Sequence, residues 1–244
     1  MNSHSLKPKH VEGLVRQWLE KEVAAGTIKN RMAAVRWWAR KVNRQNVVAR
    51  SNDFYGIPNR IFATGSSKAK SVSATQLEKV RDPYVRMSLE LQQAFGLRRE
   101  EAIKFMPSYA DQGDHLILKP SWTKGGKVRA IPIRTEDQRI VLDRAHKLAG
   151  KGSFIPSHRN YVQQLRVYEG HTLRAGLSKM HGLRHAYAQQ RYEELTGWKS
   201  PAADGLPSKT LTREQQDRGR QARLIISREL GHEREQITSV YLGR

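Results

Sequence analysis

The chain has 244 residues, of which 38% are hydrophobic, enough to build one large domain or two small ones with real cores. It contains no cysteine, which excludes disulfide bonds and thiolate metal sites. Lysine and arginine total 44 against 23 acidic residues, a formal charge of +21. A surplus of this size attracts polyanions, so the composition favours nucleic acid as the partner. The alternative is a basic surface that serves solubility alone.

Targeting and membrane signals are weak in this sequence. It holds no apolar run of the roughly eighteen residues that a membrane helix needs. The first ten residues, MNSHSLKPKH, lack the apolar core of a signal peptide. No single amphipathic helix carries the basic charge, which argues against a membrane-surface role. We therefore expect a protein without membrane contact, located in the cytoplasm.

Residues 9–42 have a helical pattern of apolar side chains at three- and four-residue spacing. The AAGT sequence predicts a break, with Gly26 ending the first helix and Thr27 capping the second. The second helix is predicted to turn four side chains to the core: Ile28, Met32, Val35 and Trp38. Its other positions present five basic residues that we expect to contact DNA: Lys29, Arg31, Arg36, Arg40 and Lys41.

The first 65 residues hold 12 basic and 4 acidic residues, a surplus of eight. Basic helix faces are often simply solvated, but a whole small unit with this bias favours a clamp on DNA phosphates. Residues 50–73 interrupt the helical pattern with glycine, proline and serine, which is typical of a linker. We therefore predict a helical DNA-binding domain at 1–65, a linker to about residue 72, and a larger domain at 73–244.

The larger domain is predicted to begin with a helix capped by Ser73 or Thr75. Pro83 suits the first turn of the next helix, and Gly96 suits its end. Two β-rich segments flank a Gly-Gly pair and predict a hairpin with Lys124 at its tip. Their bounds are His115–Lys119 and Val128–Ile133.

Further helices are predicted at 136–148, about 160–177, 181–195 and 214–230, with a loop at 196–212. The expected fold class is therefore mainly α with one small antiparallel sheet.

Two short motifs contain residues suited to catalysis, but each motif alone is a weak indication of function. Arg98 and Glu101 are three residues apart on one helix face, so the carboxylate can orient the guanidinium. Such pairs are also common on protein surfaces.

Lys124 on a glycine-rich tip can swing into a neighbouring site, where desolvation and nearby cations would lower the pKa of its ammonium and suit proton donation. Hairpin tips are also simply exposed.

A stronger group is the HGLRHAYA sequence. His181 and Arg184 lie on one helix face, while Leu183 and Ala186 can face the core. An imidazole beside a planar guanidinium suits a phosphodiester. The alternatives for the imidazole are His171 and His185.

The last group contains His232 and Tyr241, nine positions apart. At about 100° per residue, one continuous helix would place them on opposite sides. If both face one site, the chain must break between them, and Tyr241 must lie on a separate final helix.

Taken in order, GLRxxE, TKGG, HxxRH, LGH and the later tyrosine resemble the tyrosine recombinase (phage integrase) family, in particular integrases of mobile genetic elements. The resemblance covers about residue 73 to the end, and the N-terminal helices are similar to the SAM-like core-binding domain of that family. It implies a site-specific recombinase that needs no metal or other cofactor and acts in the bacterial cytoplasm, at the nucleoid. Its implied partners are double-stranded DNA and, on DNA, three further copies of a chain that is monomeric when free.

The resemblance also implies how the strand is cut. Tyr241 would attack the scissile phosphate, form a 3′-phosphotyrosyl bond and release a 5′-hydroxyl. His181 would take the tyrosine proton, and Lys124 would protonate the leaving 5′ oxygen.

The same resemblance assigns the groups that bind the phosphate. Arg98 and Arg184 would hold the two non-bridging oxygens and neutralise their growing charge. His232 would donate a hydrogen bond to the phosphoryl group, and Glu101 would brace Arg98.

Two alternatives remain beside the recombinase. A type IB topoisomerase would share this chemistry but relax supercoiled DNA of any sequence, and a non-catalytic basic protein would only bind DNA. Because few residues follow Tyr241 in this sequence, we expect the last helix to be loosely held. Tyr241 would then reach its attacking position only when DNA or a neighbouring protomer docks it.

Overall fold

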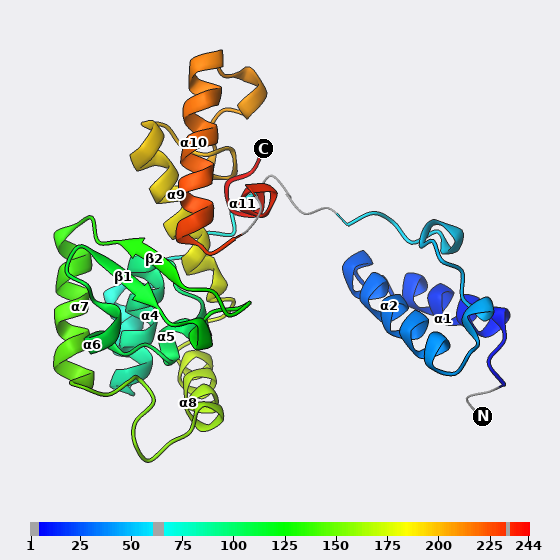
Figure 1. The fold of residues 1–244 in the computed structure, drawn as a ribbon, viewed down its shortest axis with the longest axis horizontal. Coiled ribbons are helices and arrows are strands. Elements are labelled where there is room, and N and C mark those ends of the chain that lie inside the picture. The colour runs from blue at the N-terminus through cyan, green and yellow to red at the C-terminus, as the bar shows by residue number, and fades with distance from the viewer. Residues whose placement is uncertain (1–4, 61–65, 233–234) are drawn as a thin grey trace. The chain divides into compact units, whose positions relative to one another are not determined.

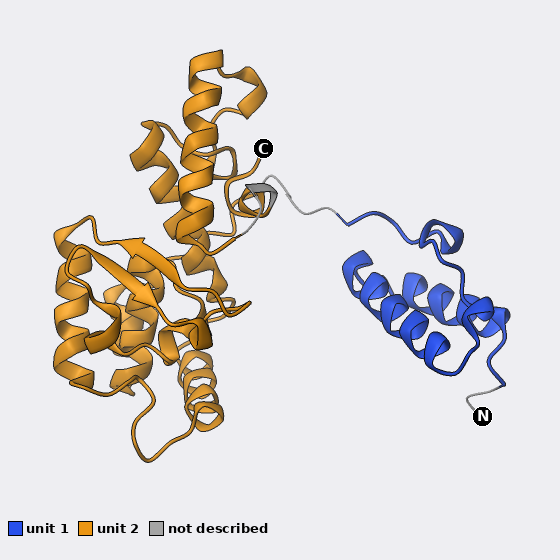
Figure 2. Ribbon diagram, viewed as in Figure 1, with its two compact units in different colours: residues 1–62 blue, residues 63–244 orange. Residues whose placement is uncertain are grey.

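The chain divides into two compact units, residues 1–62 and residues 63–244 (Figure 2). The computed structural model describes residues 5–60, 66–232 and 235–244. Most described residues are helical, and the larger unit contains one two-stranded antiparallel sheet (Figure 1). The predicted fold class is confirmed.

The first unit consists of α1 (Pro8–Glu20) and α2 (Ala25–Lys41), followed by short 3-10 turns at Gln45–Val47 and Asp53–Tyr55. The predicted break at Gly26 and Thr27 is wrong, because both residues lie in the first turn of α2. The chain turns at residues 21–24 instead, where Glu22 adopts a left-handed φ of 50°. The backbone N–H groups of the turn donate back to carbonyls of α1, which closes that helix before the glycine is reached.

One apolar stripe from each helix forms the core of the first unit. Ile28 and Met32 are fully buried, and Val35 and Trp38 pack against them, as the sequence predicts. Leu14 and Leu19 of α1 remain exposed. Two packed helices can bury only the stripes that face each other, so the other apolar positions of α1 stay in solvent.

The second unit opens with three short helices around one longer helix. These are α3 (Ala74–Glu78), α4 (Pro83–Phe95), α5 (Arg99–Ile103) and α6 (Pro107–Ala110). The predicted local signals are confirmed: the Ser73 hydroxyl caps α3, Pro83 is the first residue of α4, and Gly96 ends α4 at a φ of 61°. A side chain at Gly96 would lie 2.6 Å from the Tyr187 ring, so glycine is required there for close packing as well.

The sheet pairs β1 (His115–Leu118) with β2 (Arg129–Pro132), so the predicted hairpin is present. Leu116 faces Ile131, and Leu118 faces Arg129. These four side chains share the buried side of the sheet, which places an arginine among apolar neighbours. A 3-10 turn at Pro120–Trp122 precedes the glycine-rich tip.

The remaining elements are long helices: α7 (Glu136–Ala149), α8 (Tyr161–Arg174), α9 (His181–Thr196), α10 (Arg213–Glu229) and the shorter α11 (Glu235–Leu242). The predicted loop at 196–212 is present and contains two short 3-10 turns. α9 packs against α4 and α10, and α11 packs against both α9 and α10. This arrangement brings the start of α9, the end of α10 and all of α11 to one place (Figure 1).

Candidate active site

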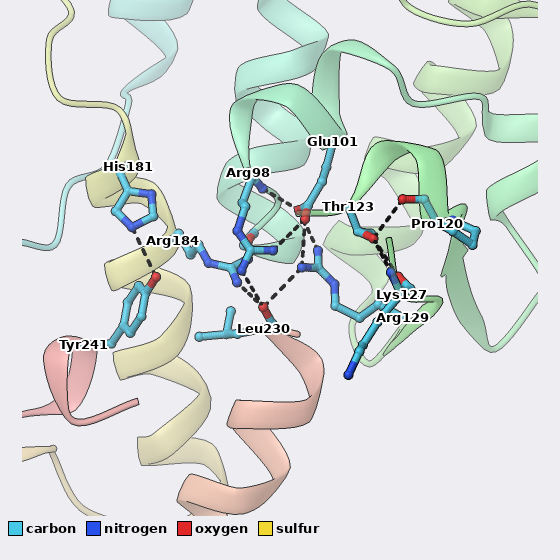
Figure 3. Close-up of polar contacts among 11 residues, drawn as sticks. Arg98, Glu101, Pro120, Thr123, Lys127, Arg129, His181, Arg184, Leu230 and Tyr241 are labelled. Carbon is cyan, nitrogen blue, oxygen red and sulfur yellow. Dashed lines mark hydrogen bonds and ion pairs between the residues drawn. The ribbon is translucent and has the colours of Figure 1, made fainter. Parts of the chain in front are cut away.

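Arg98 and Glu101 meet at the start of α5 (Figure 3). The backbone N–H of Arg98 donates to Glu101 Oε2 at 2.6 Å, and Arg98 Nη1 donates to Glu101 Oε1 at 2.7 Å. Glu101 is fully buried, whereas the Arg98 side chain keeps 22% of its surface exposed. The Glu101 carboxylate therefore holds both the backbone N–H and the guanidinium of Arg98, while part of that side chain remains exposed to solvent.

Arg129 is a second partner of Glu101 that belongs to none of the motifs in the sequence. Its Nη2 lies 2.7 Å from Glu101 Oε2 and its Nη1 lies 3.0 Å from Oε1, with only 4% of the residue exposed. One signal was available in the sequence, since Arg129 has the same strand parity as the buried Ile131. That parity alone does not name a partner.

Three guanidinium groups converge on the main-chain carbonyl of Leu230, at the end of α10 (Figure 3). Arg98 Nη2 lies 3.3 Å from this oxygen and Arg129 Nη1 lies 3.2 Å from it, and Arg184 Nη2 also donates to it. The carbonyls at a helix C-terminus carry partial negative charge, which favours this arrangement. Arg184 donates in addition to the Gly96 carbonyl.

The charges of this cluster do not cancel. Burial would raise the pKa of Glu101, but Arg129, Arg184 and Arg98 together hold it below its usual range, so the carboxyl is ionised. Burial, Arg129 and Arg98 lower the pKa of Arg184 to about 10, which still leaves it charged at neutral pH. Among the residues named here, one carboxylate faces three guanidiniums. The surplus favours an anion such as a phosphate.

Three buried nitrogen atoms of the site have no hydrogen-bond partner among the described residues. They are Nε of Arg129, Nε of Arg184 and Nδ1 of His232. A buried unpaired donor is costly, and one explanation for it is a ligand that pairs with it. Arg184 is 1% exposed, so its guanidinium is held rigidly in place.

Tyr241 and His181 form a hydrogen bond, with 3.1 Å between Tyr241 Oη and His181 Nε2. Partial burial, Arg184 and Arg98 lower the pKa of His181, so its imidazole is neutral at pH 7. A neutral imidazole can accept the phenolic proton through one ring nitrogen. The pair is thus arranged for proton transfer from tyrosine to histidine.

Three imidazole rings and one guanidinium surround the Tyr241 ring. The centroid distances are 4.5 Å to His185 and 5.3 Å to His232, and Arg184 Cζ lies 5.9 Å from the ring centre. Burial is the main cause that lowers the pKa of His185 to about 4 and of His232 to about 3. Both rings are neutral at pH 7 and pack against the tyrosine without adding positive charge.

The alternative histidines differ in position. His185 contacts the Tyr241 ring, whereas the hydroxyl bonds to His181. His171 lies on α8, where burial and Arg174 lower its pKa. Leu183 is buried as predicted, but Ala186 is only half-buried, and Tyr187 takes the core position beside it.

The chain break predicted between His232 and Tyr241 is present, because α10 ends at Glu229 and α11 begins at Glu235. The expectation that Tyr241 is loosely held without DNA is wrong. Tyr241 is 6% exposed and Leu242 is fully buried, and both belong to the main hydrophobic core. Their burial, together with hydrogen bonds to the end of α11, seats the tyrosine beside Arg184 in the free chain.

Lys124 lies at the exposed tip of the hairpin. Gly125 and Gly126 both adopt positive φ and turn the tip toward solvent, and the Thr123 hydroxyl bonds the backbone of Lys127 across it (Figure 3). Of the two alternatives for Lys124, the exposed tip is the one found in the free chain. The side chain is long and unbranched, on a turn that glycine makes adaptable.

The five basic residues predicted to contact DNA have different surroundings. Arg36 is half-buried and donates to the Ala49 carbonyl at 2.9 Å and to Asn52 Oδ1 at 3.0 Å. Arg40 is exposed on the same helix. The other three contact neighbouring side chains: Arg31 lies over Trp18, Lys41 over Trp37, and Lys29 donates to Asn59.

The residues that the structure describes form neither a metal-binding cluster nor a membrane-spanning helix. No group of three or more histidine, aspartate or glutamate side chains in that part of the chain is placed to hold a metal ion. Within the same residues, no helix combines the length and apolar character required to cross a membrane.

The comparisons with known proteins agree with this geometry. The integrase family model matches residues 62–190, more than half of the chain, and the model of the N-terminal domain of phage integrases matches residues 1–48. The chain belongs to the phage integrase family. The matches place this family member among the tyrosine recombinases that the motifs resemble. No curated protein matches this integrase in sequence.

Solved integrases share the fold at low identity. A λ integrase dimer bound to a COC′ core site has a TM-score of 0.61 at 14% identity, covering 98% of this chain and 66% of that one. The Tn1549 transposon integrase with circular intermediate DNA has a TM-score of 0.56 at 14% identity, covering 98% and 82%. A λ integrase tetramer bound to a Holliday junction has a TM-score of 0.54 at 15% identity, covering 95% and 65%. This chain spans just under two thirds of the length of these two λ integrase chains.

Proposed function

We propose that this chain is a tyrosine-type site-specific DNA recombinase that cleaves and rejoins duplex DNA through a 3′-phosphotyrosyl bond. The observation that carries the proposal is the 3.1 Å contact between Tyr241 Oη and His181 Nε2, beside a cluster of arginines with surplus positive charge. Family membership supports the same reaction.

The attack begins at the tyrosine. An unperturbed phenol has a pKa of about 10, so reaction at neutral pH requires a base that removes its proton as the bond to phosphorus forms. The neutral His181 accepts this proton through Nε2. Tyr241 Oη bonds to phosphorus while the bond to the 5′ oxygen breaks, and Lys124 supplies the proton that the leaving oxygen takes up.

The arginines act on the phosphate itself. Arg98, with its partly exposed guanidinium, binds one non-bridging oxygen, and Arg184 binds the other. The unpaired Nε of Arg184 and Nδ1 of His232 are the donors that this phosphate would satisfy. Glu101 acts through Arg98 by holding both its main chain and its side chain. Each oriented donor of this kind contributes about 100- to 1000-fold in rate.

The wider setting is part of the proposal. The related structures contain DNA core sites, transposon DNA and a tetramer on a Holliday junction. We propose that this chain likewise binds duplex DNA at an attachment site, and that it exchanges strands as a tetramer for a mobile genetic element. The surplus of 21 positive charges suits that substrate. The proposed location is the bacterial cytoplasm, at the nucleoid.

Trapping the covalent intermediate tests the proposal. A labelled duplex with the candidate attachment site carries a nick next to the cleavage position, so that the short 5′-hydroxyl strand diffuses away and rejoining stops. The wild-type chain should form an adduct at the 3′ end of the cut strand on a denaturing gel. Tyr241→Phe should bind this DNA and form no adduct, whereas the matched control Tyr161→Phe should form it normally. An adduct that persists in Tyr241→Phe would show that Tyr241 is not the nucleophile.

A further inference from the structure

The main-chain carbonyl of Tyr241 is bonded by a buried side chain of α9. Gln189 Nε2 donates to Tyr241 O at 3.0 Å, and Gln189 is 8% exposed. Gln189 lies about two helical turns after His181 on α9. One helix therefore bonds Tyr241 twice, at its hydroxyl through His181 and at its backbone through Gln189.

The orientation of the Gln189 amide is fixed by a chain of donors and acceptors. The Ala69 N–H donates to Ser67 Oγ at 3.1 Å, which leaves the Ser67 hydroxyl hydrogen for another acceptor. Ser67 Oγ lies 3.0 Å from Gln189 Oε1 and donates to it. With its oxygen occupied by Ser67, the amide presents its NH₂ group to the Tyr241 carbonyl.

Helix α11 depends on such contacts. It has eight residues, and helices this short are marginal without tertiary support. The last carbonyls of any helix also lack partners inside the helix. Here Gln189 satisfies the Tyr241 carbonyl and Arg223 Nη1 donates to the Gly243 carbonyl at 3.0 Å. Side chains of α9 and α10 thus hold the end of the helix that carries the tyrosine.

We propose that Gln189, oriented by Ser67, is a positioning residue that holds the Tyr241 hydroxyl at the distance from His181 needed for attack. This inference rests on the proposed recombinase function. It extends the site to the first described residues of the second unit, which include Ser67. The same stretch is bonded to α9 by the Lys70 N–H, which donates to the Gly182 carbonyl at 3.0 Å.

Two substitutions at Gln189 separate positioning from folding. Gln189→Met keeps the size of the side chain and removes both hydrogen bonds. Gln189→Glu places an ionised carboxylate against the Tyr241 carbonyl at high pH, but the protonated carboxyl can donate an O–H bond to that carbonyl. The matched control is Gln92→Met on α4, which removes a buried amide bonded to the Tyr168 hydroxyl, away from the site.

The measurement is the single-turnover rate of adduct formation on the nicked attachment-site duplex, with DNA affinity measured in parallel. Gln189→Met should slow the adduct about 10- to 100-fold at unchanged DNA affinity, as a small displacement of a reacting group does. For Gln189→Glu, the rate relative to wild type should rise as pH falls from 8 to 5.5. Gln92→Met should keep the wild-type rate.

Two results would overturn the inference. One is a wild-type rate in Gln189→Met, and the other is a pH-independent rate ratio for Gln189→Glu, which would reduce Gln189 to a structural residue. Failure of the proposed function has a different signature, because the wild-type chain itself would then form no adduct through Tyr241.

Discussion

Arg129 and Glu101 form a buried, bidentate ion pair, with 2.7 Å between Nη2 and Oε2 and 3.0 Å between Nη1 and Oε1. Glu101 also pairs with Arg98, so one carboxylate compensates two guanidiniums while Arg184 lies nearby. The base of the β-hairpin, the start of α5 and the end of α10 are joined through this group. Glu101 is therefore expected to matter more for stability than any one of the arginines.

Glu101→Gln should lower the free energy of unfolding by about 3–5 kcal/mol, because it leaves buried guanidiniums without a counter-charge. Arg129→Met should cost less, about 1–3 kcal/mol, since Glu101 keeps Arg98 as a partner. The control is Glu169→Gln, which breaks an exposed pair with Arg99 and should cost about 0–1 kcal/mol. Urea unfolding at pH 7 measures all three, and equal losses for Glu101→Gln and Glu169→Gln would contradict the prediction.

The features that the sequence predicted well are local ones. Ser73, Pro83 and Gly96 mark helix ends through bonds and backbone angles within a few residues, so each could be placed without knowledge of the fold. The angular argument for a break between His232 and Tyr241 likewise needs only helix geometry. The candidate site residues were found through the order of their motifs, and the structure brings most of them together.

The features that the sequence could not predict depend on distant contacts. Arg129 meets Glu101 across the fold, and Gln189 meets Tyr241 from another helix. The burial of Tyr241 depends on the core to which α9 and α10 contribute, and no residue close to Tyr241 in the sequence indicates that core. The sequence does not locate the turn between α1 and α2, because Glu22 adopts a left-handed conformation that its residue type rarely favours.

Arg36 and Arg40 of α2 should behave differently. Arg36→Ala removes bonds to Ala49 and Asn52 and should destabilise the first unit by about 1–3 kcal/mol. Arg40→Ala, at an exposed position, should leave the thermal unfolding of the full chain unchanged. It should instead weaken DNA binding and reduce the slope of log affinity against log salt by about 1. An unchanged slope for Arg40→Ala would remove this residue from the DNA contact surface.

Lys124 should act on the leaving group alone. Lys124→Ala should slow adduct formation about 100- to 10,000-fold on ordinary DNA, since the 5′ oxygen then leaves without a proton donor. A substrate with sulfur in place of that bridging oxygen should restore the rate, because a thiolate leaves without protonation. The control is Lys127→Ala on the same hairpin, which should show little of this loss. Failure of the sulfur substrate to rescue Lys124→Ala would exclude the proton-donor role.

The histidines around Tyr241 should make the free chain sensitive to acid. Burial, His181, Lys68 and Arg184 lower the pKa of His185 from 6.5 to about 4. Between these values the unfolded chain binds a proton that the folded chain does not, so stability must fall as pH falls through this window. The slope is about 1.4 kcal/mol per pH unit for each such histidine.

His185→Gln should flatten the decline in the urea midpoint between pH 6.5 and 4, while His232, with a pKa of about 3, still contributes to the remaining slope. The contribution of Glu101 to stability is lost only at lower pH, because its pKa is depressed in the fold and the carboxylate stays ionised until acid protonates it. The matched control is His158→Gln at an exposed position outside the site. Equal slopes for His185→Gln and the wild-type chain across this window would show that the imidazole beside Tyr241 is not held neutral by the fold.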